Sequence, residues 1–159
     1  MVKVALGELQ GLAQEVLAKL PEGNERAIIL ALTGELGAGK TTFVQALAKE
    51  LGVEDTVQSP TYVLMKSYLI FQGDTLKPGL SKVSPYKKLV HIDAYRLEKT
   101  EEFAALKPET FLNDPHNLVC IEWPERIEGA LPTPDLVLNF SSKDAGEAER
   151  YISINFDPK

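Results

Sequence analysis

The segment from residue 34 to residue 41 constrains this chain more than any other part of it. It reads Gly34-Glu35-Leu36-Gly37-Ala38-Gly39-Lys40-Thr41 and matches the pattern G-x-x-x-x-G-K-[ST]. Glycines let successive backbone N–H groups turn inward toward an anion, and a helix that follows adds the positive end of its dipole. The lysine can reach the β- and γ-phosphates of a nucleotide, and the threonine hydroxyl can bind Mg²⁺. We therefore predict that these eight residues form a phosphate-binding loop.

The residues on both sides of this loop fit the context that the motif requires. Residues 27–33 are almost entirely apolar, which is typical of a strand buried on both faces of a parallel sheet. Apolar side chains recur at helical spacing over residues 40–51, and Gly52 ends that pattern. The alternative is a tight strand-to-helix turn with an incidental lysine. The buried strand before the loop and the helix after it favour a phosphate site.

Helices and strands alternate along the rest of the chain. Beyond the loop we predict helices over residues 6–20 and 97–106 and strands within 62–71, 89–92 and 118–121. Residues 135–141 and 150–156 are expected to form antiparallel edge strands, and residues 72–88 a surface loop or hairpin insertion. This alternation predicts an α/β fold, a P-loop NTPase-like three-layer sheet with central parallel strands and antiparallel edge strands.

Length and composition fit one domain of this kind. The chain has 159 residues, of which 44% are hydrophobic and 25% charged, so we expect residues 1–159 to form a single domain. We find no apolar run near the roughly 18 residues of a membrane span and no signal peptide, and we expect a cytoplasmic protein with no membrane contact. The single cysteine, Cys120, excludes an internal disulfide. The net charge of −6 argues against binding nucleic acid through overall charge.

Two acidic residues follow predicted buried strands, as a phosphate loop that works with a metal ion requires. Asp93 follows Leu-Val-His-Ile, and Glu122 follows Leu-Val-Cys-Ile. Both would face the ligand crevice beyond the carboxyl ends of the strands. The short Asp93 side chain suits a fixed bond to Mg²⁺ or its bound water, and the longer Glu122 side chain suits orientation of an attacking water. From the residues alone, either acid could instead cap a following helix.

Thr61 and Trp123 are further candidates for the site. Thr61, in the segment Ser-Pro-Thr, could close over the γ-phosphate and metal as a switch residue, or the segment could be a plain turn. Trp123 directly follows Glu122 and lies near a nucleotide if Glu122 does, although lone tryptophans are more often packing residues. The two histidines lack metal-ligand spacing and are expected to be structural. Any of the four arginines could contact phosphate, although most surface arginines are only solvated.

These segments together resemble the TsaE (YjeE-type) family, small bacterial ATPases of tRNA threonylcarbamoyladenosine biosynthesis. The resemblance rests on residues 32–43 (LTGELGAGKTTF), 59–62 (SPTY), 91–96 (HIDAYR) and 121–126 (IEWPER). Their order and spacing cover nearly the whole chain. The phosphate loop alone is common to many nucleotidases, so the last two segments are the specific ones. Residues 72–88 depart from the family, because they make a longer, lysine-bearing connection where the family usually has a short hairpin.

The resemblance implies ATP and Mg²⁺ as cofactors and a set of site residues. The implied roles are phosphate and metal binding by Lys40 and Thr41 with Thr42 beside them, a switch-like segment at Thr61, metal binding at Asp93, water positioning at Glu122 and nucleotide contact at Trp123. The implied partners are homologues of TsaD and TsaB, through which contact with tRNA would be indirect. We expect weak ATP hydrolysis by the isolated protein and activation in the complex.

A small-molecule P-loop kinase is the alternative function. Such an enzyme needs a lid with several arginines that clamp the acceptor and exclude water. This chain has four arginines spread over its whole length, which disfavours a lid of that kind. A regulatory GTPase would need a guanine-specific Asn-Lys-x-Asp segment, which the sequence lacks. We therefore expect an ATP-hydrolysing component of a tRNA-modifying assembly.

Overall fold

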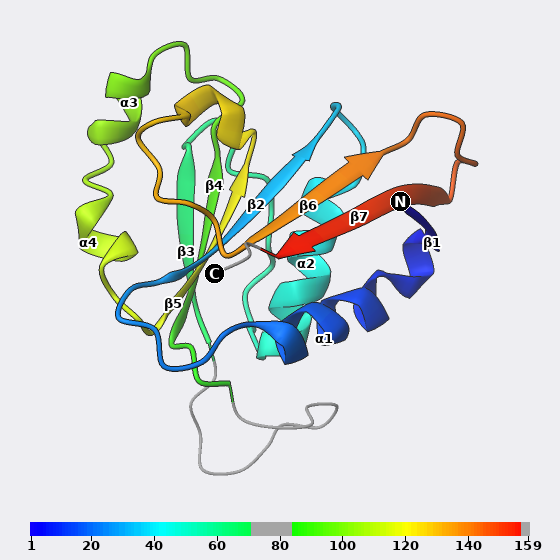
Figure 1. Cartoon of the computed structure of the whole chain (residues 1–159), viewed down its shortest axis with the longest axis horizontal. Helices are drawn as coiled ribbons and strands as arrows, with labels where there is room; N and C mark the ends of the chain where they lie inside the picture. Colours follow the sequence, from blue (N-terminus) through cyan, green and yellow to red (C-terminus); the bar gives the residue numbers. More distant parts are fainter. Residues whose placement is uncertain (71–83, 157–159) are drawn as a thin grey trace.

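One mixed sheet and the short helices on its two faces make up the computed structural model, which describes residues 1–70 and 84–156 (Figure 1). Its elements in chain order are β1 (Val2–Ala5), the 3-10 helix η1 (Leu6–Glu8), α1 (Leu9–Lys19), β2 (Ile28–Gly34), α2 (Lys40–Leu51), β3 (Met65–Leu69), β4 (Lys88–Asp93), α3 (Thr100–Ala104), α4 (Glu109–Leu112), β5 (Asn117–Glu122), the 3-10 helix η2 (Pro124–Ile127), β6 (Leu136–Ser141) and β7 (Glu149–Phe156). Residues 72–83 of the expected insertion lie outside the described residues.

The strands follow the order β1-β7-β6-β2-β5-β4-β3. β2 pairs in parallel with β5 and β6, and β4 pairs in parallel with β5, so the centre of the sheet is parallel. β3 pairs antiparallel with β4 at one edge, and β1 pairs antiparallel with β7 at the other. The predicted parallel centre with antiparallel edge strands is confirmed.

The expected positions of the edge strands are partly wrong. Residues 135–141 and 150–156 do form strands, β6 and β7, and these two pair antiparallel with each other. Neither strand is an edge, because β6 also pairs in parallel with β2, and β1 covers the outer side of β7. The two edges are β1, a four-residue strand that the sequence analysis did not predict, and β3.

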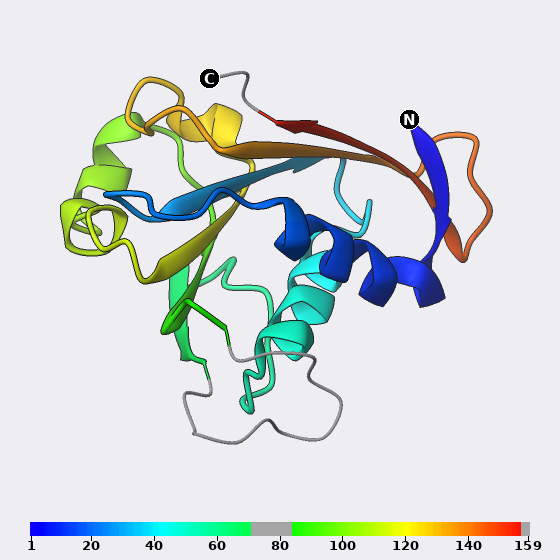
Figure 2. The same cartoon turned by 60° about the horizontal axis from the view of Figure 1, so that its bottom comes forward.

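Helices cover both faces of the sheet, which confirms the three layers. On one face, α1 and α2 lie side by side and pack on alternate residues of β2, among them Leu30 and Leu32 (Figure 2). On the other face, α3, α4 and η2 pack on Ile29 and on β4 and β5. β2 is apolar along its length because both of its faces are covered. Among the described residues, every helix is too short or too polar to cross a membrane.

The expected helix over residues 97–106 is shorter than predicted. The Glu102 carboxylate accepts hydrogen bonds from the backbone N–H groups of Glu98 (2.8 Å) and Lys99 (3.2 Å), which holds those residues outside the helix. α3 therefore begins only at Thr100. Lys107 has a φ of 52°, which ends the helical path before α4. The apolar period continues across this break because both short helices face the same core.

Candidate functional site

The phosphate loop connects β2 to α2 at the carboxyl edge of the parallel strands (Figure 1). Asp93 ends β4 and Glu122 ends β5, and the two residues lie opposite each other in the parallel register. β5 is also the direct neighbour of β2. The topology therefore brings both predicted acids beside the loop, in a cavity of about 190 Å³.

Backbone geometry at Gly34 and Gly39 explains why the loop needs glycine. Gly34 has a φ of 137°, and a Cβ built on it would lie 2.3 Å from the carbonyl oxygen of Phe140 in β6. Gly39 has a φ of 104° and is the N-cap residue of α2. These conformations turn the chain sharply from strand to helix, so that the N-terminus of α2 faces the cavity.

Lys40 is buried inside the loop, with 4% of its surface exposed. Its ammonium donates hydrogen bonds to the carbonyl oxygens of Gly34 and Glu35, the second at 3.0 Å. The same group lies 4.2 Å from the centre of the Trp123 ring, a cation–π contact. Burial lowers the pKa of Lys40, and the nearby Glu122 carboxylate opposes that shift.

Glu122 has its carboxylate fixed between the loop and the sheet. The hydroxyl of Thr41 lies 2.9 Å from Oε2, and Nε2 of His91 lies 2.6 Å from the same oxygen. Glu122 is 3% exposed. A buried carboxylate next to the loop threonine is placed to act on whatever the loop binds.

Asp93 has a different set of partners. Its Oδ2 accepts hydrogen bonds from the hydroxyls of Thr61 (2.6 Å) and Ser59 (3.2 Å). Its backbone N–H donates to the carbonyl of Leu64 at 2.9 Å, which ties the segment before β3 to the end of β4. The Ser-Pro-Thr segment therefore lies against Asp93, and Ser59 and Thr61 line the same cavity.

Most of the predicted site residues line this one cavity. They are Leu36, Gly37, Ala38, Gly39, Lys40, Thr41, Thr42, Thr61, Asp93, Glu122 and Trp123. Gly34 is not among the lining residues and contributes its carbonyl to Lys40. The carboxylate of Glu35 points elsewhere and accepts hydrogen bonds from the backbone N–H (2.5 Å) and hydroxyl (2.7 Å) of Ser142, which lower the pKa of Glu35 to about 2.

Trp123 lies at the lysine end of the cavity. Its φ of 59° reverses the chain directly after β5, and its ring packs at 5.0 Å from the ring of Tyr95. The Lys40 ammonium lies over the face of the same ring. Trp123 therefore contacts both the loop lysine and Tyr95, which follows β4.

Four residues near the site were missed or assigned otherwise by sequence reasoning. Leu6, Ser59 and Arg150 line the cavity, and Arg150 donates a hydrogen bond to the carbonyl of Gly37 at 3.3 Å. The sequence analysis places Leu6 only at the start of a helix and Arg150 only among four arginines that could contact phosphate. The pairing of β1 with β7 brings both to the loop. His91, expected to be structural, contacts Glu122, and its position two residues before Asp93 on the same strand could have indicated this.

The arrangement has the donors that a nucleotide and Mg²⁺ need. Mg²⁺ prefers oxygen ligands and is usually held by one or two carboxylates together with phosphate oxygens. The hydroxyl of Thr41 and the carboxylates of Glu122 and Asp93 supply such oxygens around the loop. Within residues 1–70 and 84–156, no group of three or more His, Cys, Asp or Glu side chains suits a metal. Mg²⁺ would therefore need hydroxyl and phosphate oxygens as well.

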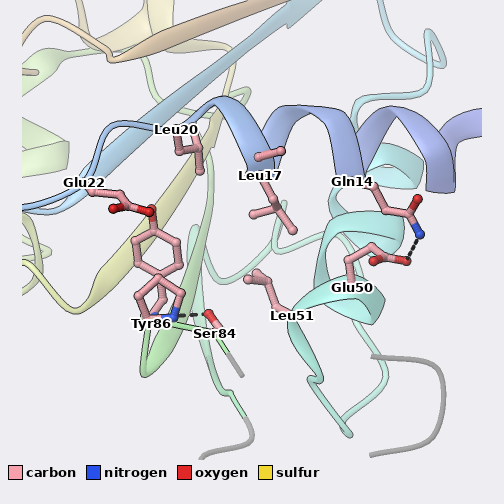
Figure 3. A pocket seen from close by; sticks show the side chains of 10 residues that line it. Gln14, Leu17, Leu20, Glu22, Glu50, Leu51, Ser84 and Tyr86 are labelled. Carbon is pink, nitrogen blue, oxygen red and sulfur yellow. Dashed lines mark hydrogen bonds between the residues drawn. The ribbon is translucent and has the colours of Figure 1, made fainter. Parts of the chain in front are cut away.

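A second cavity of about 140 Å³ lies near the opposite end of α2 (Figure 3). Leu17, Leu20 and Leu51 give it an apolar wall, and Gln14 donates a hydrogen bond to Glu50 at 3.1 Å across its rim. It contains none of the residues of the phosphate loop.

Comparisons with known proteins agree with these motifs. The model of the family described as "Threonylcarbamoyl adenosine biosynthesis protein TsaE" matches residues 5–152. A relative from Haemophilus influenzae, named tRNA threonylcarbamoyladenosine biosynthesis protein TsaE, is 34% identical over 130 residues, which are 82% of this chain and 72% of the relative. A relative of the same name from Bacillus subtilis is 36% identical over 126 residues, 79% and 68% of the two chains.

A solved structure shows the same fold. The crystal structure of YdiB from Bacillus subtilis superposes with a TM-score of 0.60 and 26% sequence identity, covering 98% of this chain and 84% of that chain. That likeness, together with the phosphate loop between β2 and α2, identifies the architecture as that of a P-loop NTPase. The chain belongs to the TsaE family of threonylcarbamoyl adenosine biosynthesis proteins.

Proposed function

We propose that this protein is a Mg²⁺-dependent ATPase that acts with homologues of TsaD and TsaB in the cytoplasmic threonylcarbamoyladenosine modification of tRNA. The observation that carries the proposal is the position of Glu122. Its carboxylate is buried, hydrogen-bonded to Thr41 of the phosphate loop, and in the same cavity as Lys40. A carboxylate in that place can orient a water molecule toward a phosphate bound by the loop.

The residues around the loop fall into two groups, those that would bind ATP and those that would act in its hydrolysis. Backbone N–H groups of the loop and the N-terminus of α2 would bind the phosphates, and Lys40 would leave the carbonyls of the loop for phosphate oxygens. Thr41, with the two carboxylates, would hold Mg²⁺, which supplies positive charge that neutralises the phosphate oxygens when it is bound. Thr61 would cover the terminal phosphate from its place beside Asp93.

The arginines support a low activity of the isolated protein. Among the described residues, Arg150 is the one arginine that lines the cavity, and its guanidinium is occupied by backbone carbonyls, including those of Glu147 (3.1 Å) and Gly37 (3.3 Å). Arg96 and Arg126 lie over aromatic rings outside the cavity. We therefore expect slow hydrolysis alone and faster hydrolysis with the partner proteins, which would also make the contacts with tRNA.

The test measures phosphate release from ATP by the protein alone, with both partner homologues, and with EDTA in place of Mg²⁺. Glu122→Gln should lower the turnover at least about 100-fold, because it removes the carboxylate that acts on the water. The affinity for ATP in the presence of EDTA, followed through Trp123 fluorescence, should stay the same, because the loop and Lys40 still bind the phosphates. Glu128→Gln, at an exposed position directly after η2, is the matched control and should leave both values unchanged.

Three results would count against the proposal. Full turnover by Glu122→Gln would remove Glu122 from the reaction. A Trp123 fluorescence response that is equal for ATP and GTP would argue against an adenine nucleotide as the specific ligand. If the partners left the rate unchanged and a small acceptor molecule became phosphorylated, the protein would be a small-molecule P-loop kinase.

A further inference from the structure

His91 and Glu122 lie on neighbouring strands directly below the phosphate loop. β4 and β5 pair in parallel, with Asp93 opposite Glu122 and His91 opposite Cys120. Side chains alternate between the two faces of a strand, so His91 and Asp93 face the same side. His91 therefore lies on the same face as Asp93 but two residues before the carboxyl end of β4.

The contact between the two side chains is short and buried. Nε2 of His91 lies 2.6 Å from Oε2 of Glu122, and His91 has no exposed surface. The hydroxyl of Thr41 lies 2.9 Å from the same oxygen and 3.1 Å from Oε1 of Glu122. A carboxylate oxygen accepts hydrogen bonds, so Glu122 can take one from the Thr41 hydroxyl and one from His91 in the tautomer with its proton on Nε2. Glu122 is thus held from below by the sheet and from above by the loop.

The other nitrogen of the ring shows that packing alone does not explain this histidine. Nδ1 of His91 is buried and has no hydrogen-bond partner among the described residues. A buried polar atom without a partner destabilises a protein. An apolar side chain, such as those of the neighbours Val90 and Ile92, would fill the position without that cost. Unlike an apolar side chain, the histidine can form a hydrogen bond with Glu122.

We infer that His91 is a positioning residue, which keeps the Glu122 carboxylate in the orientation that ATP hydrolysis needs. This inference rests on the proposed function and adds to it the group that acts through Glu122. A glutamate side chain has several rotatable bonds, and Lys40 offers it a competing positive charge in the same cavity. If the Thr41 hydroxyl bound Mg²⁺ instead, the contact with His91 would still hold the carboxylate to the sheet.

The test compares three replacements of His91. His91→Leu removes the donor, His91→Asn keeps an amide that is too short to reach Glu122, and His91→Gln brings an amide N–H to the place of Nε2. With both partner proteins present, the Leu and Asn variants should lower kcat about 10- to 100-fold, as losses of such supporting contacts do. KM and the ATP affinity from Trp123 fluorescence should change less than about threefold, and Gln should recover most of kcat.

Two controls separate positioning from loss of structure. His116→Gln alters the exposed histidine and should leave kcat unchanged. In a Glu122→Gln background, His91→Asn should lower kcat little further, because residues that act as a unit are not additive. Circular dichroism of each variant checks folding, and the Asn and Gln variants provide the comparison if the Leu variant does not fold.

The possible results separate the positioning role of His91 from the proposed ATPase activity. Wild-type kcat in folded His91→Asn, or equal losses in His91→Asn and His91→Gln, would overturn the role of His91 while leaving the ATPase intact. An undiminished loss from His91→Asn in the Glu122→Gln background would show that His91 does not act through Glu122. Absence of ATP hydrolysis by the wild-type protein with both partners would refute the proposed function itself, and the positioning role with it.

Discussion

Gly34 is the residue at which one added methyl group should be most damaging. Its φ of 137° lies in the region that other residues rarely adopt, and a Cβ there would lie 2.3 Å from the carbonyl oxygen of Phe140. Gly34 and Phe140 are partners in the parallel ladder between β2 and β6. The obstructing atom therefore belongs to the backbone of a central strand and cannot move aside as the end of a side chain would.

The cost of Gly34→Ala has two parts. The backbone conformation costs about 1–2 kcal/mol for a residue with a Cβ. Real Cβ atoms essentially never approach another atom below 3.0 Å, so β2 and β6 would have to separate by most of an ångström. Such overpacking costs about 1–3 kcal/mol. We expect Gly34→Ala to lower the free energy of unfolding by about 2–5 kcal/mol.

Gly37→Ala is the matched control within the same loop. Gly37 also has a positive φ, 78°, but a Cβ there would meet nothing within 4 Å. Only the backbone term applies, so we expect a loss of about 1–2 kcal/mol. Urea unfolding followed by circular dichroism gives both values, provided that the denaturant slope stays constant. If Gly34→Ala costs no more than Gly37→Ala, the close approach to Phe140 does not determine the need for glycine.

Two further predictions concern residues at the rim of the site. Hydrogen bonds from Ser142 lower the pKa of Glu35 from 4.5 to about 2, so they favour the folded state fully above pH 4.5 and less as the pH falls toward 2. Glu35→Gln should therefore lower the free energy of unfolding by less than about 1 kcal/mol at pH 6, since the carboxylate is exposed. The difference in unfolding free energy between variant and wild type should vanish near pH 2. A difference that does not depend on pH would contradict this. Arg150→Ala should weaken ATP binding, measured by calorimetry, about tenfold, because a charge-assisted hydrogen bond to the carbonyl of Gly37 in the loop is lost. An unchanged affinity for ATP would show that Arg150 does not support the loop.

The parts of the site that sequence predicts are those that local rules determine. The phosphate loop is contiguous, and the apolar run before it and the helical spacing after it require only neighbours in the chain. Asp93 and Glu122 were placed correctly beside the loop because parallel strands end at one edge of a sheet, whatever the rest of the fold is. One general rule was enough to bring together residues that are far apart in sequence.

The parts that sequence did not predict depend on pairing between distant strands. β1 has four residues and no clear period, and only its pairing with β7 makes it a strand. That pairing moves the edge of the sheet outward, and it brings Leu6 and Arg150 to the phosphate loop. The local sequence predicts a helix from Leu6 and a strand from Arg150, and it does not indicate that either residue lies beside the loop. The error in the edge strands and the two missed residues thus have one physical cause.

Asp93 and Glu122 have different hydrogen-bond partners, which also come from segments distant in the sequence. Both follow a similar apolar stretch, and the sequence distinguishes them only by the length of the side chain. In the fold their partners differ: Glu122 is bonded to Thr41 of the loop and to the sheet, and Asp93 to the hydroxyls of the Ser-Pro-Thr segment. That segment lies outside helices and strands, and its next residue, Tyr62, is 83% exposed. The two acids thus belong to different parts of the fold: Glu122 is tied to the sheet and the loop, and Asp93 to a segment outside the regular elements.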